Sequence, residues 1–313
     1  MMLRALLTPL SWAYAWAGAK RLRDARPAHA PVPVVCVGNL TLGGAGKTPI
    51  SRAVRAKLGP GAHLLSRGYG GKLAGPLRVT PDMNAADVGD EPLLHAVDGP
   101  AWIARDRVAG ARSAALAGAH AIIMDDGFQN PGLAKDLSLL VFDAGFGIGN
   151  GAVFPAGPLR EPLQAGLKRA DAVVQLISGA AAAEPPVWDW LGDFEGPILR
   201  AWLAPDADLP PGPYVAFAGL ARPEKFFDSL AAMNAELAET VPYPDHHPYS
   251  EDDIAWLKRL AEERGARLIT TEKDAVRLSP EARAGIAILP VKARFEDEAQ
   301  LDALLAPILS RMT

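Results

Sequence analysis

A glycine-rich turn between an apolar run and a predicted helix offers the clearest chemistry in this chain. Residues 38–49, Gly-Asn-Leu-Thr-Leu-Gly-Gly-Ala-Gly-Lys-Thr-Pro, directly follow the apolar run 34–37. When a strand delivers such a turn into a helix N-terminus, several backbone N–H groups point at one spot and can bind phosphates. We therefore predict a nucleotide-binding loop made of eight consecutive residues: Thr41, Leu42, Gly43, Gly44, Ala45, Gly46, Lys47 and Thr48.

The last two residues of this loop, Lys47 and Thr48, are those whose side chains we expect to contact the nucleotide and its metal. Lys47 would contact the β- and γ-phosphates, and Thr48 would offer its hydroxyl to Mg²⁺. The eight-residue phosphate-loop pattern begins with Gly, whereas this chain has Thr41. A glycine-rich turn that only packs a helix on a sheet is the alternative interpretation. The Gly-Lys-Thr ending and the preceding apolar run favour nucleotide binding.

Two acidic motifs extend this chemistry. Asp125 and Asp126 follow the apolar run 121–124, and an acidic residue at a strand end can hold Mg²⁺ in a phosphate-loop enzyme. The sequence does not order the two around the metal. Asp90 and Glu91 lie between Gly89 and Pro92, where a carboxylate could accept a hydroxyl proton. Taken alone, this second motif is more typical of a solvated helix cap.

Further polar groups also lie in short loops. Residues 244–249 contain His246 and His247, which are adjacent and therefore poorly placed to bind one metal together. One of them could orient a catalytic carboxylate, and a surface loop is the plain alternative. Arg160, in the segment 157–162, could stabilise phosphate charge.

Short apolar runs that alternate with helical patterns predict the scaffold. Runs without polar alternation, at 32–37, 63–66, 121–124, 137–142 and 172–176, indicate a parallel sheet covered on both faces. Ligands of such sheets bind beyond the carboxyl ends of the strands, where these motifs lie. A second, smaller α/β unit is predicted from 214 onward. We expect four segments: an N-terminal helix at 1–26, a phosphate-loop NTPase-like domain at 27–180, a linker at 181–212 and a C-terminal α/β domain at 213–313.

Composition and net charge argue against several kinds of protein and site. The chain has 313 residues, 49% of them hydrophobic, and its net charge of −4 gives no general attraction to nucleic acid. The single cysteine, Cys36, excludes an internal disulfide and a cysteine-based zinc site, and it lies in a run that we expect to be buried.

The N-terminal segment has competing interpretations. Residues 5–19 carry no charge and precede Lys20, Arg21, Arg23 and Arg26. The run is short for a membrane span and contains Pro9. A signal peptide fits the small residues 17–19 but not the basic cluster that follows them. We favour an interfacial helix, with its aromatic residues at a membrane surface, over a helix packed only on the protein's own core.

Together these motifs resemble the tetraacyldisaccharide 4′-kinases, the lipid A 4′-kinases of Gram-negative bacteria. The matching segments occur in the family's order over nearly the whole chain: 37–49, 66–70, 89–92, 125–129, 158–162, 245–247 and 270–274. Ser-Arg-Gly-Tyr-Gly, Asp-Asp-Gly-Phe-Gln and Thr-Glu-Lys-Asp are the specific ones, because phosphate loops are generic.

The resemblance implies a reaction and a set of roles. ATP with Mg²⁺ would phosphorylate the 4′-hydroxyl of an acylated glucosamine disaccharide at the cytoplasmic face of the inner membrane, giving lipid IVA. The catalytic residues would be Asp90 as general base, its supporting His246, Lys47 and Arg160. The metal-binding residues would be Thr48, Asp125, Asp126 and Glu161. His247 receives no role, and neither nucleic acid nor a stable protein partner is implied.

The resemblance also implies two α/β/α units joined by a hinge, with the active site between them. Two alternatives remain open at this point. One is a phosphate-loop kinase of a soluble sugar or nucleoside, and the other is a nucleotide-driven switch that hydrolyses ATP without an acceptor.

Overall fold

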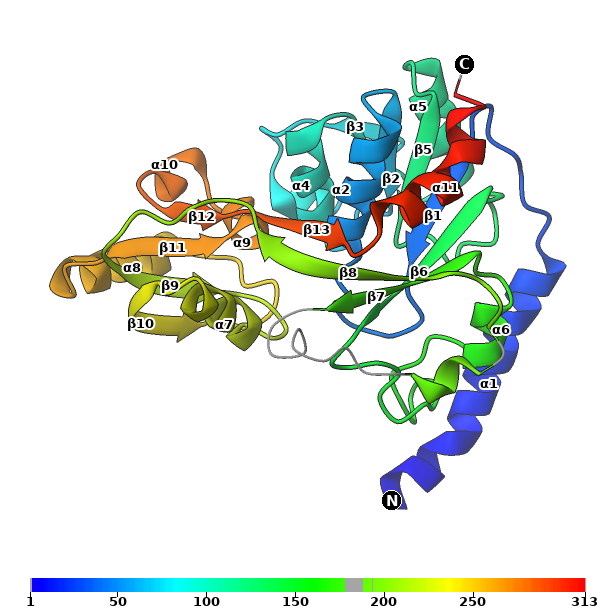
Figure 1. Cartoon of the computed structure of the whole chain (residues 1–313), viewed down its shortest axis with the longest axis horizontal. Coiled ribbons are helices and arrows are strands. Elements are labelled where there is room, and N and C mark those ends of the chain that lie inside the picture. Colours follow the sequence, from blue (N-terminus) through cyan, green and yellow to red (C-terminus); the bar gives the residue numbers. More distant parts are fainter. Residues whose placement is uncertain (1, 178–187, 193, 313) are drawn as a thin grey trace.

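A nine-stranded, mostly parallel sheet forms the centre of the larger unit in the computed structural model, which describes residues 2–177, 188–192 and 194–312 (Figure 1). In spatial order the strands are β13 (Val291–Phe295), β8 (Ile198–Pro205), β7 (Ala172–Ile177), β6 (Leu137–Asp143), β1 (Val34–Gly38), β5 (Ala121–Asp125), β2 (Ala62–Ser66), β4 (Ala101–Ile103) and β3 (Leu77–Val79). Only the edge pairs β13–β8 and β3–β4 are antiparallel. The predicted phosphate loop leaves β1, near the middle of this sheet.

Both faces of this sheet are covered, which is why its central strands are apolar without alternation. Every residue of β1, β5 and β6 is buried. One face packs against α2 (Lys47–Leu58), α4 (Asp90–Asp98) and α11 (Glu298–Leu309). The other packs against α5 (Arg107–Leu116) and α6 (Leu163–Leu167), together with the 3₁₀ helix η2 (Asp189–Leu191). The short α3 (Ala85–Val88) leads into α4. The predicted α/β/α phosphate-loop fold is confirmed.

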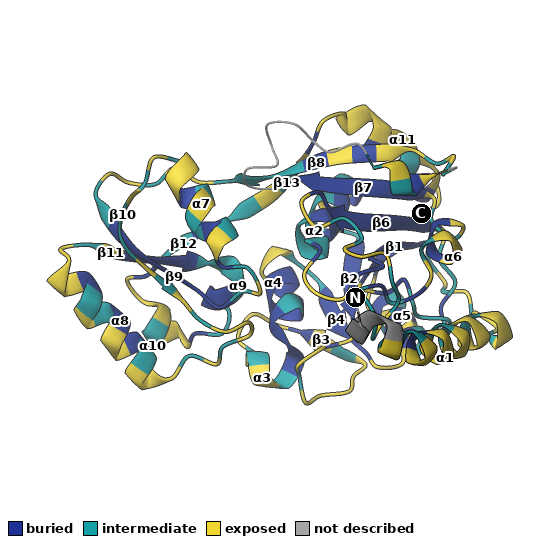
Figure 2. Ribbon diagram, turned by 90° about the horizontal axis from the view of Figure 1, so that it is seen from below, coloured by how far each residue is buried: buried dark blue, intermediate teal, exposed yellow. Residues whose placement is uncertain are grey.

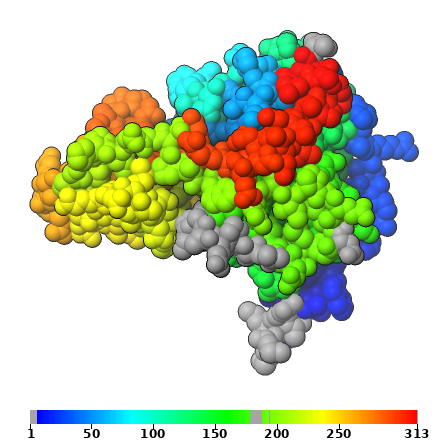
Figure 3. Space-filling model, viewed as in Figure 1, coloured from blue at the N-terminus to red at the C-terminus, as the bar shows by residue number. Residues whose placement is uncertain are grey.

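The second unit has its own parallel sheet of four strands, in the order β10 (Glu236–Pro242), β9 (Pro213–Ala218), β11 (Arg267–Thr271) and β12 (Ala287–Leu289). One face is covered by α7 (Glu224–Ala232) and the other by α8 (Glu251–Glu263). The short helices α9 (Glu272–Ala275) and α10 (Pro280–Arg283) follow β11. Ser250 caps α8 through a reciprocal capping box with Asp253. In the space-filling view this unit forms the narrow end of the molecule (Figure 3).

The division between the two units differs from the expected one. Part of the predicted linker 181–212 lies outside the described residues, but 198–205 within it form β8, a strand of the large sheet. The predicted C-terminal domain 213–313 also returns to the first unit, because β13 pairs with β8 and α11 packs against α2. The second unit is thus inserted between two paired antiparallel strands. Composition along the sequence does not reveal this, because Arg200 interrupts the apolar residues of β8, and burial alternates over its first half and is only partial over its second half.

The helix α1 (Met2–Asp24) lies along the edge of the first unit and is mostly exposed (Figure 2). Its less exposed positions within the helix, 7, 8, 11, 15, 18 and 22, form one helical stripe. Ser11 accepts a hydrogen bond from the backbone of Ala156 at 3.0 Å, and Tyr14 meets Phe154 edge to face. Other large apolar side chains are exposed: Leu6, Leu10, Trp12 and Trp16. No helix within the described residues is long and apolar enough to cross a bilayer.

Candidate active site

The phosphate loop lies at the carboxyl end of β1 and opens into α2. Gly46 precedes the helix with a φ of 75°, and a Cβ there would come within 2.1 Å of Leu176, so only glycine fits. Lys47 extends to Asn39, whose amide oxygen lies 3.3 Å from Nζ. The loop thus presents the first backbone N–H groups of α2, the arrangement that binds phosphate at a helix N-terminus.

Thr41, where the loop pattern has glycine, is buried and held by neighbours on both sides. Its backbone pairs with Leu159 in an isolated bridge, and its carbonyl accepts hydrogen bonds from Asn39 at 2.8 Å and Arg160 at 3.2 Å. Thr41 is not among the residues with positive φ. The position therefore does not require glycine, and the departure from the pattern leaves the loop intact.

Asp125 ends β5 beside the phosphate loop, since β1 and β5 are adjacent and Val37 is in register with Asp125. Its Oδ2 accepts a hydrogen bond from the Thr48 hydroxyl at 3.4 Å and lies 2.7 Å from Nε2 of His95, a buried residue of α4. Its Oδ1 is buried without a partner among the described residues. An unpartnered buried carboxylate oxygen is costly unless something binds it. Asp125 and Thr48 therefore fit a cation.

Asp126 differs from its neighbour in both exposure and partners. It is an exposed residue with a φ of 54°, and its Oδ1 accepts from Arg160 at 2.8 Å and lies 3.5 Å from Lys47 Nζ. Partial desolvation alone would raise the pKa of Asp126, but the charges of Lys47 and Arg160 outweigh it and lower that pKa. The structure thus brings Lys47, Asp126 and Arg160 together as one charged cluster.

Glu161, also predicted to bind metal, is one step removed from this cluster. Its Oε2 is ion-paired with Arg169, and its Oε1 accepts from Gln129 at 3.1 Å. Gln129 in turn donates to the Asn39 carbonyl at 2.9 Å, so Glu161 supports the base of the loop. Within the described parts of the chain, no three His, Cys, Asp or Glu side chains gather as a metal site. A magnesium ion here would depend on Thr48, Asp125 and nucleotide phosphates, which is common for Mg²⁺.

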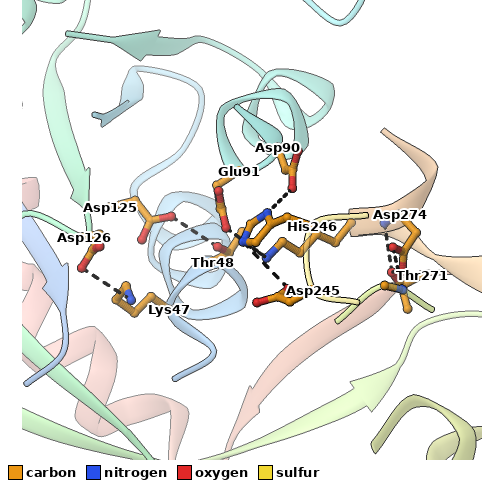
Figure 4. A network of polar contacts seen from close by, with 12 residues as sticks. Lys47, Thr48, Asp90, Glu91, Asp125, Asp126, Asp245, His246, Thr271 and Asp274 are labelled. Atoms are coloured by element: carbon orange, nitrogen blue, oxygen red, sulfur yellow. Dashed lines mark hydrogen bonds and ion pairs between the residues drawn. The ribbon is translucent and has the colours of Figure 1, made fainter. Parts of the chain in front are cut away.

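The second predicted centre, Asp90 with His246, is assembled from both units (Figure 4). Asp90 begins α4 in the first unit, and His246 lies in the loop between β10 and α8, in the second. The His246 Nδ1 lies 2.8 Å from Asp90 Oδ2. An ionised Asp90 carboxylate can only accept, so Nδ1 of His246 donates to it. Arg277 Nη2 also lies 3.4 Å from Nδ1, and Lys273 Nζ lies 3.4 Å from Nε2.

The loop after β2 supports Asp90 from behind. Gly89 has a φ of 92°, and a Cβ on it would come within 2.4 Å of the Tyr69 carbonyl oxygen. Only glycine allows the segment 66–71 to approach the start of α4 so closely. The Tyr69 ring then meets the His246 ring edge to face, with centroids 6.5 Å apart. The Ser-Arg-Gly-Tyr-Gly motif thus shapes the surroundings of the carboxylate.

His247, which received no role, packs elsewhere. It lies against Tyr243 and Tyr249, and its Nε2 is 3.1 Å from Asp253 in the capping box of α8.

The sequence interpretation missed two contributors, His95 and Arg277. His95 lies five residues after Asp90 in α4, and Arg277 lies three residues after Asp274, near the end of α9. The i,i+3 spacing from Asp274 could have indicated Arg277, whereas His95 contacts Asp125, 30 residues away, and no local spacing indicated it.

Ion pairs connect the two units on both sides of the site. Arg52 of α2 binds Glu272 of α9 at 3.0 Å, and Lys273 binds Glu91 at 3.3 Å. On the other side Asp143, at the end of β6, binds Arg222 at 3.0 Å and also Lys225. The arrangement places a phosphate-binding loop and a carboxylate capable of accepting a proton along one boundary between units. This is the chemistry needed to move a phosphoryl group to a hydroxyl.

Comparisons with known proteins agree with this geometry. The family model of tetraacyldisaccharide-1-P 4′-kinases matches residues 3–310. The chain belongs to this family. It is 54% identical to the tetraacyldisaccharide 4′-kinase of Hyphomonas neptunium over 98% of this chain and 92% of that one. It is 51% identical to that of Rhodospirillum centenum, over 99% and 93%.

A solved structure extends the family match to three dimensions. The crystal structure of LpxK from Aquifex aeolicus, described as an "apo" form in complex with ATP, matches with a TM-score of 0.81 and 28% sequence identity. The match covers 98% of this chain and 99% of that one. Both units of the 4′-kinase fold described above are therefore shared with that protein.

Proposed function

We propose that this chain is an ATP-dependent tetraacyldisaccharide 4′-kinase. It transfers the γ-phosphate of ATP to the 4′-hydroxyl of the tetraacyldisaccharide 1-phosphate, forming lipid IVA in lipid A biosynthesis. The observation that carries the proposal is a family match over residues 3–310 on a chain whose phosphate loop and Asp90–His246 pair lie at one boundary.

Each residue near ATP has a physical task. Lys47 and the backbone N–H groups of the loop hold the phosphates, and Arg160 adds positive charge beside Asp126. Thr48 and Asp125 would hold Mg²⁺, which neutralises developing charge on the phosphate oxygens. His95 fixes the orientation of the Asp125 carboxylate through its 2.7 Å contact.

Asp90 orients the attacking hydroxyl and accepts its proton. Its Oδ2 is occupied by partners from the second unit, so Oδ1 is the oxygen left to face the acceptor. Burial alone would raise the pKa of Asp90, but hydrogen bonds from His246 and Arg277 lower it, so the carboxylate is ionised at neutral pH. A weakly basic carboxylate suffices where the transition state is loose and the proton leaves late.

We also propose that α1 places the enzyme on the inner surface of the inner membrane. Its outward side carries Leu6, Leu10, Trp12 and Trp16, followed by four basic residues, Lys20, Arg21, Arg23 and Arg26. Apolar and aromatic residues next to basic ones suit the boundary of an anionic bilayer. An acceptor whose acyl chains remain in the bilayer would then be met at its surface.

A phosphorylation assay tests the activity. Purified protein is incubated with γ-labelled ATP, Mg²⁺ and the acylated disaccharide 1-phosphate in mixed micelles, with glucosamine and nucleosides as competing acceptors. Label in the lipid is expected. Label in a soluble acceptor alone would favour the soluble-substrate kinase, and ATP loss without any labelled acceptor would favour a switch.

Binding to vesicles tests the membrane placement separately. The variant Leu10→Ser/Trp16→Ser should bind anionic vesicles at least about tenfold more weakly, since burying one large apolar side chain contributes about 1.5–3 kcal/mol. Leu116→Ser is the matched control, because Leu116 is 91% exposed but lies on α5. Equal binding of both variants and the unaltered protein would contradict an interfacial role for α1.

A further inference from the structure

Arg277 is a buried guanidinium held between two carboxylates from different units. Its Nη1 donates to Asp274 Oδ1 at 2.9 Å and to the Gly219 carbonyl at 2.9 Å, both within the second unit. Its Nε donates to Asp90 Oδ2 at 2.8 Å, and its Nη2 lies 2.7 Å from the same oxygen, in the first unit. The side chain is 4% exposed, so these contacts are shielded from water.

The inner half of this arrangement is rigid. Asp274 is fully buried, and its Oδ1 accepts from the Gly219 backbone at 3.0 Å and from the Tyr249 hydroxyl at 2.9 Å. Its Oδ2 accepts from the Thr271 hydroxyl at 2.6 Å. A buried carboxylate bound by four donors cannot turn, so it fixes the plane of the guanidinium that it pairs with.

The outer half determines how Asp90 is presented. Both Arg277 contacts and the His246 contact fall on Oδ2, which fixes the carboxylate plane and leaves Oδ1 without a partner among the described residues. Arg277 is permanently charged, and it contacts Asp90 Oδ2 through two of its nitrogens. It therefore places a constant positive charge beside this carboxylate.

We propose that Arg277 is the positioning residue of the acceptor site, and that the second unit thereby orients Asp90 only while the two units are in contact. The inference rests on the proposed kinase activity and deepens it. The phosphate loop, Thr48 and Asp125 belong to the first unit alone. ATP can therefore bind without the contact, whereas the carboxylate that receives the hydroxyl proton is aligned through it.

The charged groups around Asp90 define the expected pH dependence. His246 and Lys273 face it from the second unit together with Arg277, while Glu91 follows it in α4 and pairs with Lys273. Removal of the Arg277 charge should raise the pKa of Asp90, because the hydrogen bonds and opposite charge that favour the carboxylate are lost. Since Asp90 works ionised, the acid limb of kcat/KM should move to higher pH.

A double-mutant cycle tests the assignment. Arg277→Met should lower kcat by about 10²-fold, the cost of a misplaced catalytic group, with the KM for ATP unchanged. Arg277→Lys keeps the charge but not the two-point contact, so it should recover part of kcat and hold the acid limb low. Arg264→Met is the matched control, because Arg264 pairs only with exposed Glu239 in the same unit.

The loss of kcat caused by Arg277→Met and the loss caused by Asp90→Asn should not multiply in the double variant. If Arg277 acts through Asp90, then adding Arg277→Met to Asp90→Asn should cost little more than Asp90→Asn alone. Full multiplication of the two losses, or normal kcat in Arg277→Met, would overturn the assignment. If Arg277→Met does not fold, Arg277→Lys carries the same cycle.

A measurement without turnover separates this inference from the proposed function. The Asp90 carboxyl is titrated by carbon NMR in the unaltered protein and in the Arg277 variants, and its midpoint should rise when the charge is lost. An unchanged midpoint overturns the inference even in an active enzyme. A raised midpoint in a protein that phosphorylates no lipid would support Arg277 and contradict the proposed activity instead.

Discussion

The proposed donor site and the proposed acceptor site of this molecule are built in different ways. The donor site, with Lys47, Thr48 and Asp125, lies within one sheet, where β1 and β5 are adjacent and in register. The acceptor site joins Asp90 of the first unit to His246 and Arg277 of the second. The first is rigid because one core supports it, and the second exists only at a boundary between units.

This difference indicates how the enzyme could separate binding from chemistry. In the proposed mechanism a nucleotide would need only the loop of the first unit, whereas proton acceptance would need the contact with the second. Interfaces between units of one chain open more easily than cores, because they bury less apolar surface. Hydrolysis of ATP by water would then be disfavoured while the units are apart, because the proton acceptor is not aligned.

The largest expected effect separates the sites at Asp90. Asp90→Asn should lower kcat by about 10²–10⁴, the range for loss of acid–base help, with the KM for ATP nearly unchanged because Asp90 lies outside the loop. Steady-state kinetics with ATP and lipid varied separately would measure this. The control is Asp302→Asn, whose side chain is 56% exposed in α11. A large change in ATP affinity would show that Asp90 also takes part in ATP binding, which would contradict the separation of the two sites.

The lowered pKa of Asp90 predicts how stability and kcat/KM change as the pH falls. The pKa of Asp90 is lowered in the folded protein, so its contact contributes stability above the unfolded-state pKa of about 3.9. That contribution is lost as pH falls through the lowered folded-state value. The kcat/KM of the unaltered enzyme should therefore show no loss attributable to Asp90 between about pH 7 and 5. A fall over that range that is present in the unaltered enzyme and absent from Asp90→Asn would show that Asp90 is not held ionised.

Lys47→Ala is the converse test, because it alters the nucleotide-binding loop and leaves Asp90 in place. Lys47→Ala should lower kcat by about 10²–10³, as loss of a charge-stabilising donor does, and should also weaken ATP binding. Calorimetry with ATP distinguishes it from Asp90→Asn, which should bind ATP normally. Lys57→Ala, in the same helix, removes a lysine paired only with Glu298 and Asp302 on α11. Normal ATP binding by Lys47→Ala would refute the loop assignment.

The smallest expected effect concerns the link between the sites, His95. His95→Leu removes the 2.7 Å contact to Asp125 and should weaken the apparent Mg²⁺ affinity about 10–100-fold, the usual cost of losing a partner of a metal ligand. His95→Gln should recover part of it. His63→Gln, a buried histidine bonded to Trp102, is the control. Magnesium-dependent binding of ATP is the measurement, and identical curves for His95→Leu and the unaltered protein would remove His95 from the site.

Elements made from neighbouring residues were predictable from the sequence. The strand–loop–helix around Lys47 and the strand before Asp125 are confirmed, because periodicity acts over a few residues. Strands β3, β4, β10 and β13 were not predicted. β3, β10 and β13 lie at sheet edges, where burial is partial, and β4 is buried but only three residues long.

The same distinction, between local patterns and contacts between distant residues, applies to the two sites. The sequence alone predicted the nucleotide-binding loop and determined its strand–loop–helix setting: a loop ending in Gly-Lys-Thr, a strand before it and an acid after a buried strand are local patterns with few structural alternatives. It also determined the family, through motifs in order. Only the tertiary structure decided that Asp125 meets Thr48 while Asp126 meets Lys47 and Arg160. It alone showed that Arg277, 187 residues after Asp90, holds that carboxylate. Such contacts depend on how two sheets dock, and no spacing within one element encodes that.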